Sequence, residues 1–107
     1  MTEIPHIDKS LPHDMPDGQW IDMWGDEVWI KDRRRHRTDG PALIRRNGTR
    51  MWFQNGDRHR TDGPAIIYSN GIVKWCLNDW YYTLEEWLEA NDEITDKQKF
   101  LLKLKYG

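Results

Sequence analysis

The heptapeptide His-Arg-Thr-Asp-Gly-Pro-Ala occurs twice in this chain, at His36–Ala42 and again at His59–Ala65, 23 residues apart. A fixed short period indicates similar supersecondary units that stack side by side. The period extends beyond the heptapeptide, because a step of 23 residues carries Trp29 to Trp52 and then to Trp75. The sequence therefore predicts a repeat architecture, and repeat scaffolds mainly provide surfaces for recognition.

Each period is predicted to form a β-hairpin. Asn47-Gly48 and Asn70-Gly71 each lie between two runs rich in β-forming residues. Asn-Gly in this setting is a strong hairpin signal, because both residues tolerate a positive φ. We expect an antiparallel meander of about three such units, with the three in-phase tryptophans along one face.

The two ends of the chain differ from the repeats. His13 is in phase with His36 and His59 and starts a degenerate copy, so the hairpin sheet is predicted over residues 13–82. Residues 1–12 carry two prolines and no period, and are predicted to be an extended arm. Capping boxes at Thr83 and Thr95 predict two short helices, at about 83–90 and 96–105, that form a C-terminal cap over residues 83–107. The second helix would carry Phe100, Leu101 and Leu104 on one side. The whole is one mainly β (α+β) domain.

Composition limits the function classes. The single cysteine, Cys76, excludes an intrachain disulfide, and the sequence has no targeting signal or long apolar run. We therefore expect a cytoplasmic protein with no membrane association. An exposed first strand could pair with a second copy at the sheet edge.

The net charge of −2 conceals three segments of opposite sign. Residues 1–32 have net charge −6, residues 33–60 have +7 and residues 61–107 have −3. All nine arginines lie in the middle segment, so we expect a basic stripe between acidic flanks. The guanidinium group suits carboxylates and phosphates, and it stacks on aromatic rings. The residues predicted to bind a partner are Arg33, Arg34, Arg35, Arg37, Arg45, Arg46, Arg50, Trp52, Arg58 and Arg60.

The repeated histidine and aspartate admit two interpretations. A row of histidines with Asp39 and Asp62 could bind a metal ion or exchange protons. The alternative is structural, because Asp-Gly suits a tight turn, proline fixes φ, and the ring can donate a hydrogen bond to a turn carbonyl. We favour the structural role, because an active site is normally unique whereas scaffold residues recur. The residues assigned to the scaffold are His36, Asp39, Gly40, Pro41, His59, Asp62, Gly63, Pro64, Trp29 and Trp75.

Catalysis has little support in the sequence. Cys76 lies within an apolar run and is interpreted as a packing residue, and no phosphate-binding glycine loop or zinc-type ligand spacing is present. We therefore predict no enzymatic activity, no cofactor and no metal.

The segment Trp52–Ala65, followed by Tyr68–Gly71, resembles a repeat found in small proteins of tailed bacteriophages. Those chains also end in a Leu-Asn strand and a Thr-x-x-Glu-Trp-Leu helix, as at Leu77-Asn78 and Thr83–Leu88. The unit length resembles a divergent MORN repeat, and similar repeats occur in antitoxin-like bacterial proteins. MORN repeats carry Gly-x-Gly where this chain has Asp-Gly-Pro, so their lipid binding is not carried over.

The resemblance implies a hairpin sheet that binds another protein. A phage source would imply an inhibitor or modulator of a host defence protein that acts in the host bacterial cytoplasm. Two alternatives stay open: a nucleic-acid-binding protein, which the acidic flanks disfavour, and an antitoxin-like neutraliser.

Overall fold

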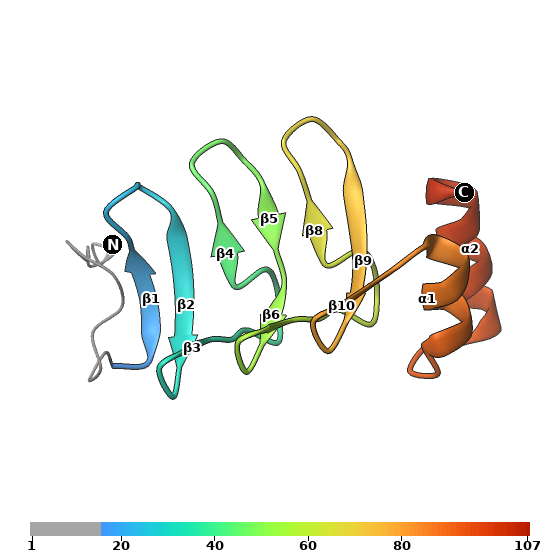
Figure 1. Ribbon diagram of the computed structural model, residues 1–107, viewed down its shortest axis with the longest axis horizontal. Helices are drawn as coiled ribbons and strands as arrows, with labels where there is room; N and C mark the ends of the chain where they lie inside the picture. Colours follow the sequence, from blue (N-terminus) through green and yellow to red (C-terminus); the bar gives the residue numbers. More distant parts are fainter. Residues whose placement is uncertain (1–15) are drawn as a thin grey trace.

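The computed structural model describes residues 16–107, in which ten short strands precede two helices (Figure 1). The predicted arm at residues 1–12 and the in-phase His13 lie outside the described residues. The elements are β1 (Gly18–Ile21), β2 (Glu27–Lys31), β3 (Arg34–Arg35), β4 (Leu43–Ile44), β5 (Arg50–Met51), β6 (Phe53–Gln54), β7 (Asp57–Arg58), β8 (Ile66–Ile67), β9 (Val73–Leu77), β10 (Trp80–Tyr82), α1 (Leu84–Ala90) and α2 (Asp96–Tyr106).

The strands form a mainly antiparallel β structure that runs along the long axis of the molecule. Within the described part, seven strands follow in the order β1-β2-β4-β5-β8-β9-β10, and β3 pairs with β2 as an eighth. Strands β6 and β7 pair separately. The predicted combination of an antiparallel sheet and two C-terminal helices is confirmed.

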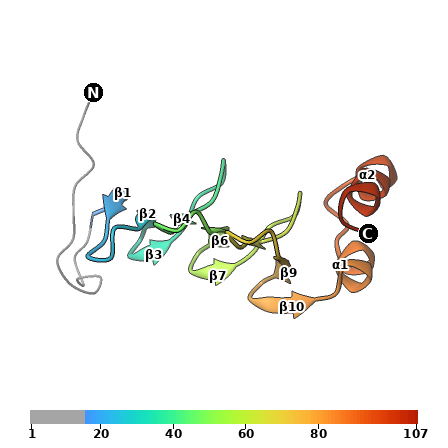
Figure 2. The same ribbon diagram turned by 90° about the horizontal axis from the view of Figure 1, so that it is seen from above.

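The second strand of each predicted hairpin continues into another hairpin. Thus β2 pairs with β1 and β3, β9 pairs with β8 and β10, and the β5–β6 segment pairs with β4 and β7. We call β1–β2, β4–β5 and β8–β9 the upper hairpins, and β2–β3, β6–β7 and β9–β10 the lower hairpins, by their places in Figure 1. Seen from above, β3, β7 and β10 lie on one side of the sheet, while the turns of the later upper hairpins lean to the other (Figure 2). Each heptapeptide connects a lower hairpin to the next upper hairpin, so we call His36–Ala42 and His59–Ala65 the connectors.

The two kinds of hairpin use different turns. The lower turns have two consecutive residues with positive φ, as at Asn55 (53°) and Gly56 (87°), which is typical of two-residue hairpin loops. In the upper turns only the glycine has positive φ, 95° at Gly48 and 90° at Gly71. Both residues of Asn47-Gly48 tolerate a positive φ, but only the glycine adopts one here. Asn47 instead accepts a hydrogen bond from the backbone N–H of Thr49 at 2.9 Å through its side chain.

Both helices begin at the predicted capping boxes, with Thr83 and Thr95 as N-caps. The helices lie at the end of the sheet next to β9 and β10 (Figure 1). Helix α1 buries Trp87 and Leu88 against β9, and Leu102 and Tyr106 of α2 pack on the same cluster. A second cluster, around Val28, Ile30, Ala42, Leu43 and Phe53, lies under the earlier hairpins.

The apolar side predicted for α2 faces solvent. Phe100, Leu101 and Leu104 are 60%, 53% and 68% exposed. Helical periodicity grouped these residues on one side of the helix, but α2 packs on the cluster around Trp75 through Leu102 and Tyr106 instead. In residues 16–107, no helix combines the length and the apolar character that a membrane span requires.

Candidate binding surface

The connector histidines hold neighbouring lower hairpins together. The backbone N–H of Asn55 donates to Nδ1 of His36 at 3.0 Å, and the N–H of Asn78 donates to Nδ1 of His59 at 2.9 Å. The sequence predicts a structural role in which the histidine ring donates a hydrogen bond to a carbonyl. In the structure the ring nitrogen Nδ1 accepts the hydrogen bond instead. Nδ1 must therefore be unprotonated, and in the neutral ring the proton is on Nε2.

The connector arginines fold back onto the preceding strand. Nε of Arg37 donates to Asp39 at 2.8 Å, its Nη1 donates to the carbonyl of Pro41 at 3.1 Å, and its guanidinium lies 4.1 Å from the ring centre of Trp29. Arg60 repeats this arrangement with Asp62, Pro64 and Trp52, at 2.8, 3.1 and 3.9 Å. We call this arrangement the arginine clasp. It lowers the pKa of Asp39 from the ordinary value, chiefly through the hydrogen bond from Arg37.

The remaining connector residues make room for the clasp. A Cβ atom on Gly40 would lie 2.9 Å from Cζ of Arg37, and one on Gly63 would lie 2.7 Å from Cζ of Arg60. These glycines are therefore needed for the close approach of the guanidinium. Ala42 and Ala65 are fully buried beneath the connectors. The motif is thus accounted for by internal contacts of the scaffold.

At β9 a tryptophan, Trp87, replaces the arginine. The ring of Trp87 lies 4.7 Å from that of Trp75, and Tyr106 meets Trp75 edge-on at 5.2 Å. The indole N–H of Trp87 donates to the carbonyl of Arg60 at 3.3 Å. The side chain of Asn91, which is also buried, donates to the carbonyl of Thr61 at 2.8 Å. The cap therefore binds both β9 and the second connector.

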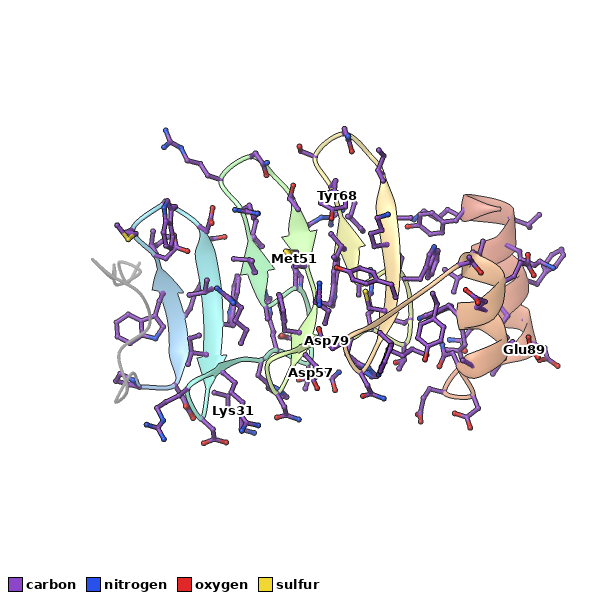
Figure 3. All side chains as sticks on the ribbon, viewed as in Figure 1. Lys31, Met51, Asp57, Tyr68, Asp79 and Glu89 are labelled. Atoms are coloured by element: carbon purple, nitrogen blue, oxygen red, sulfur yellow. The ribbon has the colours of Figure 1, made fainter. Side chains whose placement is uncertain are left out.

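The structure distributes the predicted arginines among three places instead of one stripe. Arg37 and Arg60 are held in the clasps. At the lower hairpins, Arg58 pairs with Asp79 at 2.7 Å and stacks on Tyr81, whose hydroxyl it also contacts. The pair raises the pKa of Arg58 and lowers that of Asp79, through their hydrogen bond. Figure 3 shows Asp57 and Asp79 at this lower edge.

Three more arginines lie among the lower hairpins. Arg35 stacks its guanidinium on Phe53 at 5.7 Å, and the side chain of Arg34 lies beside Gly56. Arg33 is in the β2–β3 turn with φ of 62°. The predicted aromatic anchor, Trp52, is half-buried, with Arg60 at 3.9 Å and Arg50 at 5.8 Å from its ring.

The third group lies on one upper hairpin. Arg45, Arg46 and Arg50 all belong to the β4–β5 hairpin and are exposed. Arg46 and the tip of the β1–β2 hairpin, with Met23 and Trp24, line an open hollow of about 670 Å³. Met23 and Trp24 are 55% and 63% exposed. Sequence reasoning missed these two residues, although their turn position and lack of an in-phase apolar partner signal exposure.

The β8–β9 tip extends this row. It presents Tyr68, seen at the upper edge in Figure 3, and Ile72. We define the hairpin-tip rim as Met23, Trp24, Arg45, Arg46, Arg50, Tyr68 and Ile72.

Among residues 16–107 no group of three His, Cys, Asp or Glu side chains is placed to hold a metal ion. Cys76 is fully buried, and this burial raises the pKa of its thiol to about 11. A thiol with that pKa is protonated at neutral pH and is a poor nucleophile.

Comparison of this chain with protein-family models, with curated proteins and with solved structures gave no match.

Proposed function

We propose that this protein is a non-enzymatic binding module, built from about three 23-residue hairpin units, that captures another protein through the hairpin-tip rim. The observation that carries the proposal is the division of labour among the arginines. The connector arginines, Arg37 and Arg60, form hydrogen bonds within the protein. Arg45, Arg46 and Arg50 instead lie exposed on one hairpin.

The composition of the rim supports a protein partner. Arginine, tryptophan, tyrosine and methionine are enriched where proteins meet, and a few such residues dominate the binding energy. The tips are fixed by hydrogen bonds between neighbouring upper hairpins, including the N–H of Arg46 to Asp26 at 2.8 Å and the N–H of Ser69 to Thr49 at 3.2 Å. A rigid surface loses little conformational entropy on binding.

Charge favours a partner with carboxylates. The rim arginine Arg45 pairs with Asp26, whose carboxylate lies 3.8 Å from its Nε. Asp26 is 7% exposed, so the solvent-facing charge of this hairpin is positive. The resemblance to tailed-phage repeat proteins makes a bacterial host protein, such as a defence protein, the partner that we propose. An antitoxin-like role would use the same surface against a toxin.

A nucleic-acid ligand is the second candidate, and Trp24 favours it. Its exposed ring beside the hollow at Arg46 could stack on a base while the arginines contact phosphates. The two functions differ in salt dependence, because each neutralised phosphate adds to the slope of log affinity against log salt. Affinity for oligonucleotides that falls steeply with salt would favour this candidate over a protein partner.

The direct test is affinity capture from bacterial lysate with quantitative mass spectrometry. The triple variant Arg45→Glu, Arg46→Glu, Arg50→Glu should lose the partner by at least about tenfold, because hot-spot arginines each contribute about 2 kcal/mol. The matched control is Lys97→Glu, Lys99→Glu, Lys105→Glu, which makes the same charge change on α2. Capture that survives the arginine reversals, or that both triples abolish equally, would refute the rim.

A further inference from the structure

A groove separate from the rim runs between the connectors and the helical cap. Its main part, about 620 Å³, lies between the two connectors and residues Glu93, Ile94 and Gln98 of the cap. It continues into a hollow of about 460 Å³ through the shared residues Gln54, His59, Thr61 and Glu93. At the other end it continues into a smaller hollow of about 190 Å³ through Asp62, Ile94 and Gln98. We call the three parts together the connector groove.

The solvent-facing charge of the connector groove is negative, although the groove crosses the most arginine-rich part of the sequence. In the two clasps the carboxylates are on the outside: the side chains of Asp39 and Asp62 are 83% and 73% exposed. The side chains of Arg37 and Arg60 are only 24% and 20% exposed, since they lie on tryptophan rings. Asp92 and Glu93 add two exposed carboxylates from the opposite wall.

The small hollow at the other end is apolar. It is lined by Ile94, Leu101 and Leu102, with Asp62 and Gln98 at its border with the main part. Leu101 is 53% exposed, so this hollow opens toward the uncovered face of α2. Between the two ends, Trp52 and Gln54 form part of the floor, and Nε2–H of His59 remains as a donor because Nδ1 is already bonded.

We propose that the connector groove receives an extended peptide segment that carries basic residues next to an aliphatic one. The basic side chains would lie against Asp39, Asp62 and Glu93, and the aliphatic side chain would fill the hollow at Leu101. An extended chain is the form that fits, because the three hollows are joined end to end and border groups that can bond to peptide N–H and C=O. The groove has the opposite charge to the hairpin-tip rim, so this inference does not depend on the proposed function.

The test is a binding measurement with defined probes on the full chain. The probe is a fluorescein-labelled peptide of alternating lysine and glycine that ends in two leucines, followed by fluorescence anisotropy. The Glu93→Lys variant should weaken binding about fivefold or more, because it removes an attraction and adds a repulsion. Its matched control is Glu89→Lys, the same charge change on the outer side of α1 (Figure 3).

The apolar end has its own matched pair. Leu101→Ser should weaken binding several-fold, since part of a leucine-sized contact is lost, whereas Leu104→Ser should not, because Leu104 does not line the hollow. All four sites are exposed, so the variants should fold, and circular dichroism checks this. The proposal is overturned if the probe does not bind at millimolar concentration, if a glutamate-for-lysine probe binds equally well, or if each variant behaves like its control.

Discussion

The hairpin sheet and the helical cap cover their tryptophans in different ways. In the sheet, Trp29 and Trp52 each lie under an arginine of the next connector and stay half-buried. In β9, Trp75 lies under Trp87 and is 6% exposed. An arginine covers an aromatic ring while its charge stays near water, so the same contact can be used again in the next unit. At β9, by contrast, Trp75 and Trp87 shield each other from water, and no further hairpin unit follows within the described residues.

The largest effect should come from the cap. Trp87→Ala removes a fully buried ring and should lower the free energy of unfolding by roughly 3–5 kcal/mol. Arg60→Ala, which removes a clasp, should cost about 1–2 kcal/mol, because the contact is partly exposed. Urea unfolding measures both. Trp80→Ala is the control, since Trp80 is 72% exposed, and a Trp87 variant no less stable than this control would remove the difference between the two regions.

The connector glycines offer a sharper test of the clasp. Gly63→Ala places a methyl group against the guanidinium of Arg60 and should cost about 1 kcal/mol by displacing it. The cost should disappear in an Arg60→Ala background, where nothing opposes the methyl group. A double-mutant cycle in urea measures this coupling. Additive costs would mean that the glycine is required for another reason.

The histidine contacts test whether the two connectors are equivalent. His36→Leu and His59→Leu each leave one backbone N–H without its acceptor, and each should cost about 1 kcal/mol. The two costs should agree within about 0.5 kcal/mol, the scatter expected of independent sites. A large difference in urea unfolding would show that the 23-residue spacing does not imply equal contacts.

Much of this arrangement could be predicted from local sequence signals. The heptapeptide, the Asn-Gly pairs and the two capping boxes are short-range features, and they gave an antiparallel sheet and helix starts that agree with the structure. The lower hairpins were missed because strands such as β7 have two residues, too few for a visible alternation. The Asn55-Gly56 pair at the β6–β7 turn is the local signal that marks one of them.

The role of the arginines could not be predicted from the sequence. The arginine block suggested one basic stripe, because net charge ignores which guanidinium groups are covered. Arg37 and Arg60 differ from Arg45 and Arg46 only in lying two residues before an aspartate, Asp39 or Asp62, that can hold Nε. The exposure of Leu101 and Leu104 was also hidden, because periodicity groups residues on one helix face without showing which face packs.

A further effect should appear at alkaline pH. Burial raises the pKa of Cys76 from 9.0 to about 11, so the thiol ionises earlier in the unfolded chain. Its contribution to stability is complete below pH 9 and is lost as the pH rises toward 11. Cys76→Ala should remove this part of the pH dependence in urea unfolding at pH 8 and pH 10.5. An unchanged dependence, or rapid thiol labelling of the folded protein at pH 8, would contradict the burial.

The central claim is that the connectors use their chemistry to hold the scaffold together, by the same arginine clasp at both sites. Double-mutant cycles for Arg37 with Trp29 and for Arg60 with Trp52 test it most directly, with each residue changed to alanine and stability measured in urea. We predict coupling free energies of about 1 kcal/mol, equal at the two sites within about 0.5 kcal/mol. Coupling near zero at either site would contradict the claim.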